Sequence, residues 1–135
     1  MSWREYLYEL PKATENEMRP FFVAWCTEEI TGARFLIRNV GNIQVEEGRH
    51  FKSGVRGQCD VYGWLFRDPY PMEFEIELKN VKTVQSAGQK AWAAYCIKFK
   101  IPYRLLRARE GETPYRVVER WANETSMWMA ELRKA

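Results

Sequence analysis

The stretch EFEIELK, Glu73 to Lys79, alternates charged and apolar residues without interruption. A period of two is typical of a β-strand, and it places the apolar residues on one face, where they are expected to meet a core. The charged residues then share the opposite face: Glu73, Glu75, Glu77 and Lys79. Three like charges spaced two apart repel one another. The stretch therefore predicts either a solvated outer face or a face on which a cation lies over the carboxylates.

Length and composition indicate a single folded domain. The chain has 135 residues, of which 46% are hydrophobic and 15% aromatic, which excludes a disordered chain. No stretch approaches the ~18 apolar residues of a membrane span, and the N-terminus is charged, unlike a signal peptide, so a cytoplasmic protein without a membrane partner is expected. Three scattered cysteines and one histidine argue against a disulfide framework and exclude sites built on several histidines.

Charge is arranged in two blocks along the chain. Residues 59–78 contain five acids and one base, whereas residues 79–110 contain eight Lys or Arg and one acid. An acidic block beside a basic block fits a cation site next to a surface for a polyanion. An ordinary salt-bridged surface would give the same pattern, so charge alone does not separate the two interpretations.

The remaining patterns predict an α/β domain with a mixed central sheet flanked by helices. The capping-box spacing of Thr14 and Glu17 predicts the start of a first helix, which ends at Thr31-Gly32. Pro20 is expected to kink this helix or to move its start to a later residue. Two further helices are predicted over 86–99 and about 114–132. Strands are predicted over 33–39, 58–67, 73–79 and 101–106, and residues 43–57 are expected to form a hairpin arm plus a loop.

Asp60, Glu77 and Lys79 carry the strongest chemical signal. Asp60 and Glu77 lie on consecutive predicted strands joined by the turn at 68–71, so antiparallel pairing can bring their carboxylates side by side. Two such carboxylates share a proton or bind a cation, and Mg²⁺ prefers hard oxygen ligands. Lys79 shares the face of Glu77, where an ammonium could hold a nucleophilic water or neutralise a phosphate oxygen. This combination indicates metal-assisted phosphodiester hydrolysis.

The runs GVRGQCDVYG, EIELKN and SAGQKAW together resemble the VRR-NUC nucleases of the PD-(D/E)xK superfamily. That family has Gly-x-x-Gly-x-x-Asp, then Glu-x-Lys on the next strand, and a Ser-x-x-Gln helix start about ten residues later. The runs IRNVG and TENEM are similar to upstream segments of small phage-type members, so the resemblance suggests a phage or prophage source. It covers about residues 14–108 of a single nuclease domain spanning 1–135, and residues 111–135 add a C-terminal helix.

The resemblance implies a role for each matching residue. Asp60 and Glu77 would be ligands of Mg²⁺ or Mn²⁺, and the Leu78 carbonyl would add a third oxygen. Lys79 would position the attacking water. Gln89 would bind the lysine or the water from the start of its helix, where it also fits a plain capping role.

The first helix is expected to contribute one more carboxylate to this site. We assign it to Glu15, which shares a helical face with Met18 and Phe22, the face that must meet the sheet. Glu17 is the alternative, although it already fits the capping box. The sequence departs from the family at Glu75, where an apolar residue is usual. Glu75 is therefore expected either to face solvent or to add a carboxylate to the metal site.

The resemblance implies a Mg²⁺- or Mn²⁺-dependent endodeoxyribonuclease. Stand-alone members act on branched DNA as homodimers, which favours cleavage of Holliday junctions or other branched structures, and Trp3, Tyr6 and Tyr8 could cover the dimer interface. Five basic residues are candidate phosphate contacts: Arg38, Lys52, Arg56, Lys82 and Lys90. Two alternatives stay open, a non-catalytic nucleic-acid-binding protein that retains the nuclease fold and a small interaction protein with charged patches.

Overall fold

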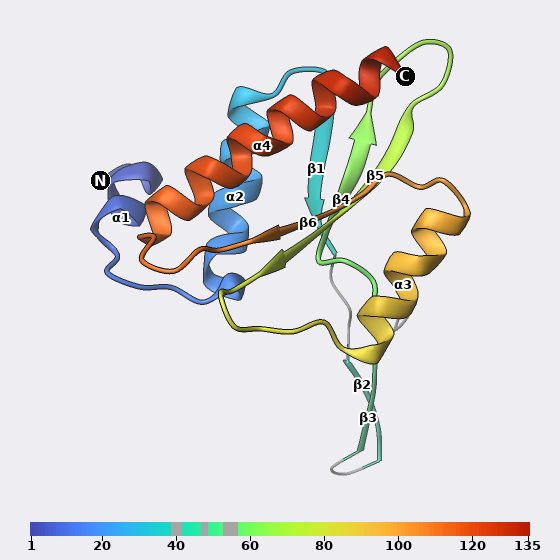
Figure 1. The fold of residues 1–135 in the computed structure, drawn as a ribbon. Helices are drawn as coiled ribbons and strands as arrows, with labels where there is room; N and C mark the ends of the chain where they lie inside the picture. The colour runs from blue at the N-terminus through green and yellow to red at the C-terminus, as the bar shows by residue number, and fades with distance from the viewer. Residues whose placement is uncertain (39–41, 47–48, 53–56) are drawn as a thin grey trace.

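The computed structural model describes the backbone of residues 1–38, 42–46, 49–52 and 57–135, and the side chains of residues 1–38 and 57–135. Figure 1 shows the path of the chain. Its elements follow in the order α1 (Trp3–Glu9), α2 (Glu15–Glu29), β1 (Ala33–Ile37), β2 (Asn42–Glu46), β3 (Arg49–Lys52), β4 (Val61–Leu65), β5 (Met72–Lys79), α3 (Ala87–Lys98), β6 (Tyr103–Arg107) and α4 (Pro114–Lys134). The predicted α/β class with a mixed sheet is confirmed.

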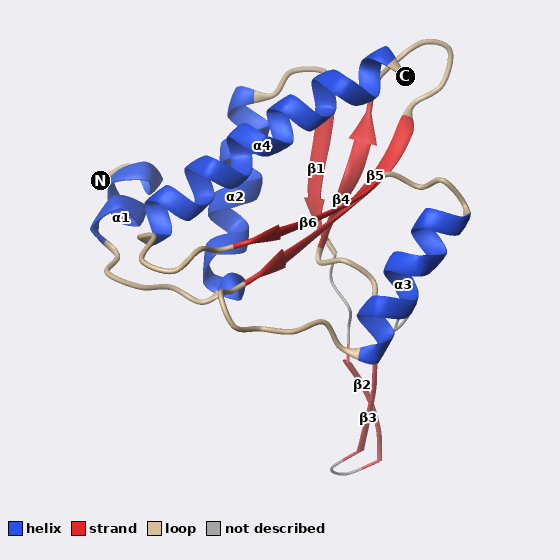
Figure 2. Cartoon of the chain, in the orientation of Figure 1, coloured by secondary structure: helices blue, strands red, loops and turns tan. Residues whose placement is uncertain are grey.

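Four strands form the central sheet in the order β1-β4-β5-β6. β4 pairs antiparallel with both β1 and β5, whereas β6 runs parallel to β5 after the α3 crossover. β2 and β3 pair as a separate two-stranded hairpin that extends away from the sheet (Figure 2). The hairpin lies between β1 and β4 in the chain, so it leaves the sheet at the end where β1 stops and β4 begins.

The apolar face of β5 lies in the core, as its alternation predicts. Phe74, Ile76 and Leu78 are all buried and pack on the side of α2 and α4, where Phe74 lies against Trp128 with ring centroids 6.0 Å apart. Phe22 of α2 meets Trp121 of α4 edge to face, which joins the two helices above the sheet. α3 covers the opposite, polar face of β5.

Local capping signals place the helix starts. Thr14 and Ser86 each form a complete capping box with the residue three positions later, and Thr113 caps α4 ahead of Pro114. α2 starts at Glu15 and contains Pro20, so the alternative of a later start was wrong. No helix in the described part of the chain is long and apolar enough to cross a membrane.

Two features of the helices differ from the sequence predictions. α1 was not predicted, because seven residues give a weak periodic signal; Trp3 orders it by packing against Phe21 and Trp25 of α2. Ile97 follows Ala93 at helical spacing and, with Trp92 and Cys96, would form an apolar stripe on α3, but Ile97 is exposed, and Cys96 is the buried residue of this fully described helix. The reason is that α3 lies over a polar sheet face, which gives its apolar side chains little to pack against.

Candidate functional site

The polar face of β5 is buried. Glu75, Glu77 and Lys79 are 0%, 3% and 4% exposed, respectively, beneath α3 and the segment that precedes it. A solvated outer face is therefore excluded for these three residues, and each carboxylate needs donors to offset its desolvation.

Arg38 is the cation that lies over Glu75. Its guanidinium binds both oxygens of Glu75, at 2.8 and 3.0 Å, and also donates to the Cys59 carbonyl at 2.7 Å. The Trp92 Nε1 of α3 donates to the same carboxylate at 3.0 Å. Burial raises the pKa of Glu75, and the Arg38 and Trp92 hydrogen bonds offset part of that increase.

This ion pair changes the expected roles of two residues. Glu75 neither faces solvent nor stands free to join a metal site, because all its described contacts are with Arg38 and Trp92. The Arg38 guanidinium, a candidate phosphate contact from the sequence, faces inward and lies 4.3 Å from the centre of the Tyr62 ring. Through Glu75, the residue after β1 and helix α3 are both attached to β5.

Glu77, Lys79 and Gln89 come together as the sequence predicts. The Lys79 Nζ donates to Gln89 Oε1 at 2.9 Å and lies 3.8 Å from Glu77 Oε1. Gln89 Oε1 also accepts from the Ser86 backbone N–H at 2.9 Å, so Gln89 has both the capping role and the lysine contact. Because the cap fixes the amide of Gln89, the ammonium of Lys79 is held in one place next to Glu77.

Two further residues bind Glu77 that sequence reasoning missed. The Tyr103 hydroxyl and the Gln85 Nε2 both donate to Glu77 Oε2, the latter at 2.7 Å. Glu77 Oε1 is buried and has no hydrogen-bond partner among the described residues. Burial and the neighbouring Glu77 carboxylate raise the pKa of Tyr103 far above its usual range, so this hydroxyl stays a donor. Tyr103 lies on a strand whose parallel register with β5 leaves no local trace in the sequence.

α2 contributes the other part of the site. Val61 of β4 is paired with Ile76 of β5, so the residue before Val61, Asp60, has its backbone beside that of Glu77. The Asp60 carboxylate accepts from Arg19 of α2 at 2.8 Å, a contact that the sequence analysis did not include. Glu15, one helical turn before Arg19, accepts from the Asn80 backbone N–H at 3.0 Å, at the end of β5. The alternative residue, Glu17, is engaged with Thr14 in the capping box.

The donor set suits a hard divalent cation. Mg²⁺ is usually held by one or two carboxylates together with waters, and the buried Glu77 Oε1 accepts no hydrogen bond from the described residues. No group of three or more His, Cys, Asp or Glu side chains converges on a metal position among the residues whose side chains are described. An ion here would therefore depend on few protein oxygens and on waters, in contrast to a closed protein cage.

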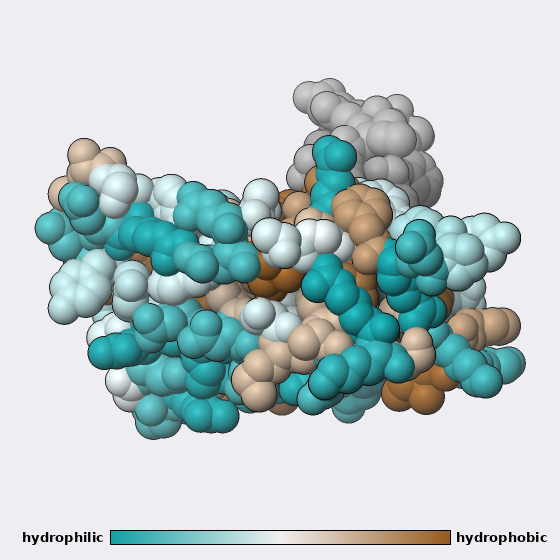
Figure 3. Space-filling view, turned by 90° about the horizontal axis from the view of Figure 1, so that it is seen from above, coloured by the Kyte–Doolittle hydropathy of each residue, from teal (hydrophilic) through white to brown (hydrophobic). Residues whose placement is uncertain are grey.

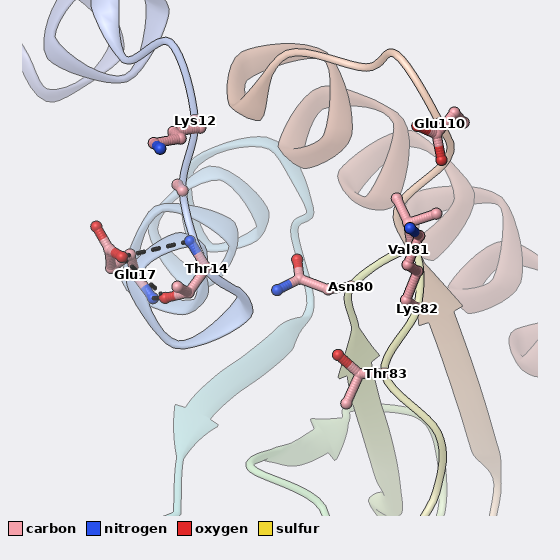
Figure 4. A pocket seen from close by; sticks show the side chains of 9 residues that line it. Lys12, Thr14, Glu17, Asn80, Val81, Lys82, Thr83 and Glu110 are labelled. Atoms are coloured by element: carbon pink, nitrogen blue, oxygen red, sulfur yellow. Dashed lines mark hydrogen bonds between the residues drawn. The ribbon is translucent and has the colours of Figure 1, made fainter.

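An open pocket of about 800 Å³ lies beside this site, between the start of α2 and the segment after β5. Figure 4 shows Asn80 and Thr83 facing the Thr14–Glu17 wall across it, with Lys12 and Lys82 at its sides. Arg107 fixes the segment after β5 by donating to the Asn80 and Thr83 carbonyls at 2.8 and 2.5 Å. The pocket therefore has one wall fixed by Arg107 and a lining of mixed charge, with Lys12 and Lys82 beside Glu17 and Glu110.

The candidate phosphate contacts fall into two groups besides Arg38. Lys82 and Lys90 are exposed on the segment after β5 and on α3. Arg56 and the side chain of Lys52 lie outside the described residues.

Comparisons with protein-family models, with curated proteins and with solved structures found no match.

The Arg38–Glu75 pair generates a stability prediction. Arg38→Met leaves a buried carboxylate without its cation and should lower the free energy of unfolding by about 3–5 kcal/mol. Arg38→Met/Glu75→Leu removes both charges and should recover most of that loss. Urea denaturation of the three proteins measures both effects, and a double variant no more stable than Arg38→Met would contradict the assignment.

The same pair predicts a pH dependence in the Arg38→Met variant. Burial raises the folded-state pKa of Glu75 above its ordinary value of 4.5, and without Arg38 it should rise further. The folded state then holds the proton more tightly than the unfolded state, so stability decreases as the pH rises through the folded-state pKa. Lowering the pH from 7 towards 5 should therefore reduce the stability deficit of Arg38→Met relative to the wild type, measured by urea denaturation at each pH.

Proposed function

We propose that this protein is a Mg²⁺- or Mn²⁺-dependent endonuclease of the PD-(D/E)xK type that hydrolyses phosphodiester bonds in DNA. One observation carries the proposal: a buried lysine ammonium, held at 2.9 Å by Gln89, lies 3.8 Å from a carboxylate oxygen of Glu77 that has no other partner among the described residues. The order of helices and strands around this arrangement also agrees with the resemblance to the VRR-NUC nucleases.

The residues divide the chemistry between them. A divalent ion held by Asp60, Glu77 and the Leu78 carbonyl would supply Lewis-acid activation of the phosphate and of a water. Glu15, which accepts from the Asn80 N–H at the end of β5, would support this site from α2 without being a third carboxylate ligand. Lys79 donates hydrogen bonds from its ammonium to that water or to a phosphate oxygen, where charge develops during hydrolysis. Gln89 keeps the ammonium in place.

Other residues orient Glu77 for this role. Tyr103 and Gln85 bind its second oxygen, which leaves Oε1 as the free ligand atom next to Lys79. Hydrogen-bonding partners of this kind fix the orientation of ligating carboxylates in metal sites. Glu77 and Lys79 are both buried, which also keeps bulk water from competing for the ammonium.

Charge and the resemblance support DNA as the substrate. Exposed Lys82 lines the open pocket, and exposed Lys90 lies on α3 directly after Gln89. Basic residues near a hydrolytic site neutralise phosphates and bind without regard to sequence. We extend the proposal to branched or junction DNA cut by a homodimer, since stand-alone members of the resembled family act in this way.

A second function is supported by a different observation. Asp60 is paired with Arg19, and Glu77 Oε2 has two donors, so both carboxylates are partly neutralised by the protein itself. A non-catalytic nucleic-acid-binding protein that retains the fold would keep such contacts. Binding of DNA without cleavage in any divalent metal would favour this alternative.

A matched pair of substitutions on β5 tests the nuclease proposal. Glu77→Gln and Glu73→Gln are the same chemical change on one strand, but Glu77 is in the site whereas Glu73 is exposed. Glu77→Gln and Lys79→Met should each reduce cleavage of a four-way DNA junction in Mg²⁺ or Mn²⁺ by at least about 100-fold. Glu73→Gln should cleave like the wild type, and equal rates in all four proteins would refute the proposal.

A second pair separates the two carboxylates at the start of α2. Glu15→Ala should slow cleavage with little change in thermal midpoint, because Glu15 lies against the end of β5. Glu17→Ala should cost about 1 kcal/mol of stability through the lost cap and leave the cleavage rate unchanged. Cleavage assays beside thermal denaturation give both readouts, and the reverse pattern would assign the site carboxylate to Glu17.

A further inference from the structure

α3 presents an aromatic strip that the core does not use. Trp92, Tyr95 and Phe99 follow one another at helical spacing, and Tyr95 and Phe99 are 46% and 56% exposed. The Trp92 and Tyr95 rings are stacked, with centroids 5.1 Å apart and planes inclined by 15°, and Phe99 lies 4.7 Å from Tyr95. Figure 3 shows how hydrophobic side chains interrupt the mostly hydrophilic surface of this molecule.

The aromatic strip is fixed to the fold at one end. Trp92 donates its Nε1–H to the buried Glu75 carboxylate at 3.0 Å, and Arg38 holds that carboxylate in turn. The stacked Tyr95 ring is therefore attached to the sheet through a neighbour that cannot easily rotate. A ring held in this way gives a stacking partner little conformational entropy to lose.

The charged residues of α3 and of the segments on either side of it have one sign. No Asp or Glu occurs between Lys79 and Arg109 in the sequence. Lys90, Lys98 and Lys100 are exposed on or directly after α3, and the Lys98 Nζ lies 5.5 Å from the centre of the Phe99 ring. Lysine is depleted in protein–protein interfaces, so a lysine-flanked aromatic surface suits a polyanion better than a protein partner.

The conformation of Lys100 is a second, independent observation. Its φ is +57°, in the left-handed region that favours glycine after a helix end. The Ile101 N–H binds the Cys96 carbonyl at 2.8 Å and the Lys100 N–H binds the Ile97 carbonyl at 3.2 Å, which closes the helix in the usual glycine-terminated arrangement. A lysine here costs stability that a glycine would not, and it places an ammonium directly after Phe99.

We propose that Tyr95, Phe99, Lys98 and Lys100 form a binding surface for single-stranded nucleic acid. Bases would stack on the exposed rings while the lysines neutralise the phosphates between them, the usual combination in single-strand binding. Gln89 of the candidate site is ten residues before Phe99 on the same helix, about 15 Å away at 1.5 Å per residue. The surface rests on the proposed function and deepens it. The substrate of the nuclease would then contain unpaired nucleotides next to the bond that is cut.

Stacking and charge can be tested separately by binding in the absence of any divalent metal. Fluorescence anisotropy of a labelled oligodeoxythymidine, titrated in EDTA at several salt concentrations, gives both the affinity and its salt slope. Tyr95→Ala/Phe99→Ala should weaken binding by about tenfold or more at every salt concentration, with an unchanged slope. Lys100→Gly should weaken binding and reduce the salt slope by about 0.7.

Lys100→Gly also guards against a folding artefact. Glycine removes the strain at φ +57°, so this variant should have a thermal midpoint at or above that of the wild type while binding more weakly. Tyr70→Ala and Lys134→Gly serve as matched controls, since they remove an exposed aromatic and an exposed lysine elsewhere on the chain. Both controls should bind oligodeoxythymidine like the wild type.

The outcomes separate this surface from the nuclease proposal. If the α3 variants bind like the controls while Glu77→Gln abolishes cleavage, the surface is refuted and the nuclease proposal stands. If the wild type binds through α3 but cuts no DNA, the nuclease proposal fails alone. If Tyr95→Ala/Phe99→Ala converts a dimer into a monomer in light scattering, the strip is a self-interface and the nucleic-acid surface is refuted.

Discussion

Burial of charge on one face of β5 is the constraint from which the rest of the structure follows. Glu75, Glu77 and Lys79 lie on a strand that also supplies the core with Phe74, Ile76 and Leu78. A buried carboxylate is tolerated only with donors, so the surrounding elements bring them: Arg38 from the end of β1, Trp92 from α3, Gln85 from the segment before α3, and Tyr103 from β6. The buried Lys79 ammonium has its own acceptor, the Gln89 Oε1 of α3.

This constraint also explains the unusual surface of α3. An amphipathic helix normally turns its apolar stripe towards the sheet, but the sheet face beneath α3 requires hydrogen-bond donors. The helix meets this face with two polar groups: Trp92 Nε1 donates to Glu75, and Gln89 Oε1 accepts from Lys79. Tyr95, Ile97 and Phe99 are left outside. The exposure of Tyr95, Ile97 and Phe99 is thus a consequence of the polar layer, as well as the opportunity for a ligand.

Short-range signals in the sequence were enough for much of this fold. Alternation in β5 identified its two faces, and the spacings at Thr14 and Ser86 located two helix starts. The contact between Lys79 and Gln89 was implied by the resemblance to the VRR-NUC nucleases, because ten residues between a strand end and a helix start do not by themselves bring the two together. α1 was not predictable in this way, because its formation depends on packing against α2. The exposed side of α3 was not predictable either, because it depends on the polarity of the β5 face beneath the helix.

Long-range pairings in the candidate site could not be derived from the sequence. Arg38 binds a residue 37 positions away, and Arg19 binds one 41 positions away. Tyr103 reaches Glu77 only because β6 adopts one particular parallel register with β5. Nothing in the local pattern around these residues distinguishes them from surface charges or from an ordinary strand tyrosine, so their partners emerge only with the sheet assembled.

Glu75 and Glu77 show how a fold residue and a site residue can be told apart on one strand face. Both are buried carboxylates two positions apart, and both bind donors from the same side. Each oxygen of Glu75 has a donor, and its main partner is a guanidinium that neutralises it in place. Glu77 has one buried oxygen that accepts no hydrogen bond from the described residues, 3.8 Å from an ammonium that is itself held by Gln89. A buried oxygen without a hydrogen bond costs free energy, and a bound cation would recover it. The difference between the two glutamates is therefore the physical reason to locate the chemistry at the end of β5 and not at its centre.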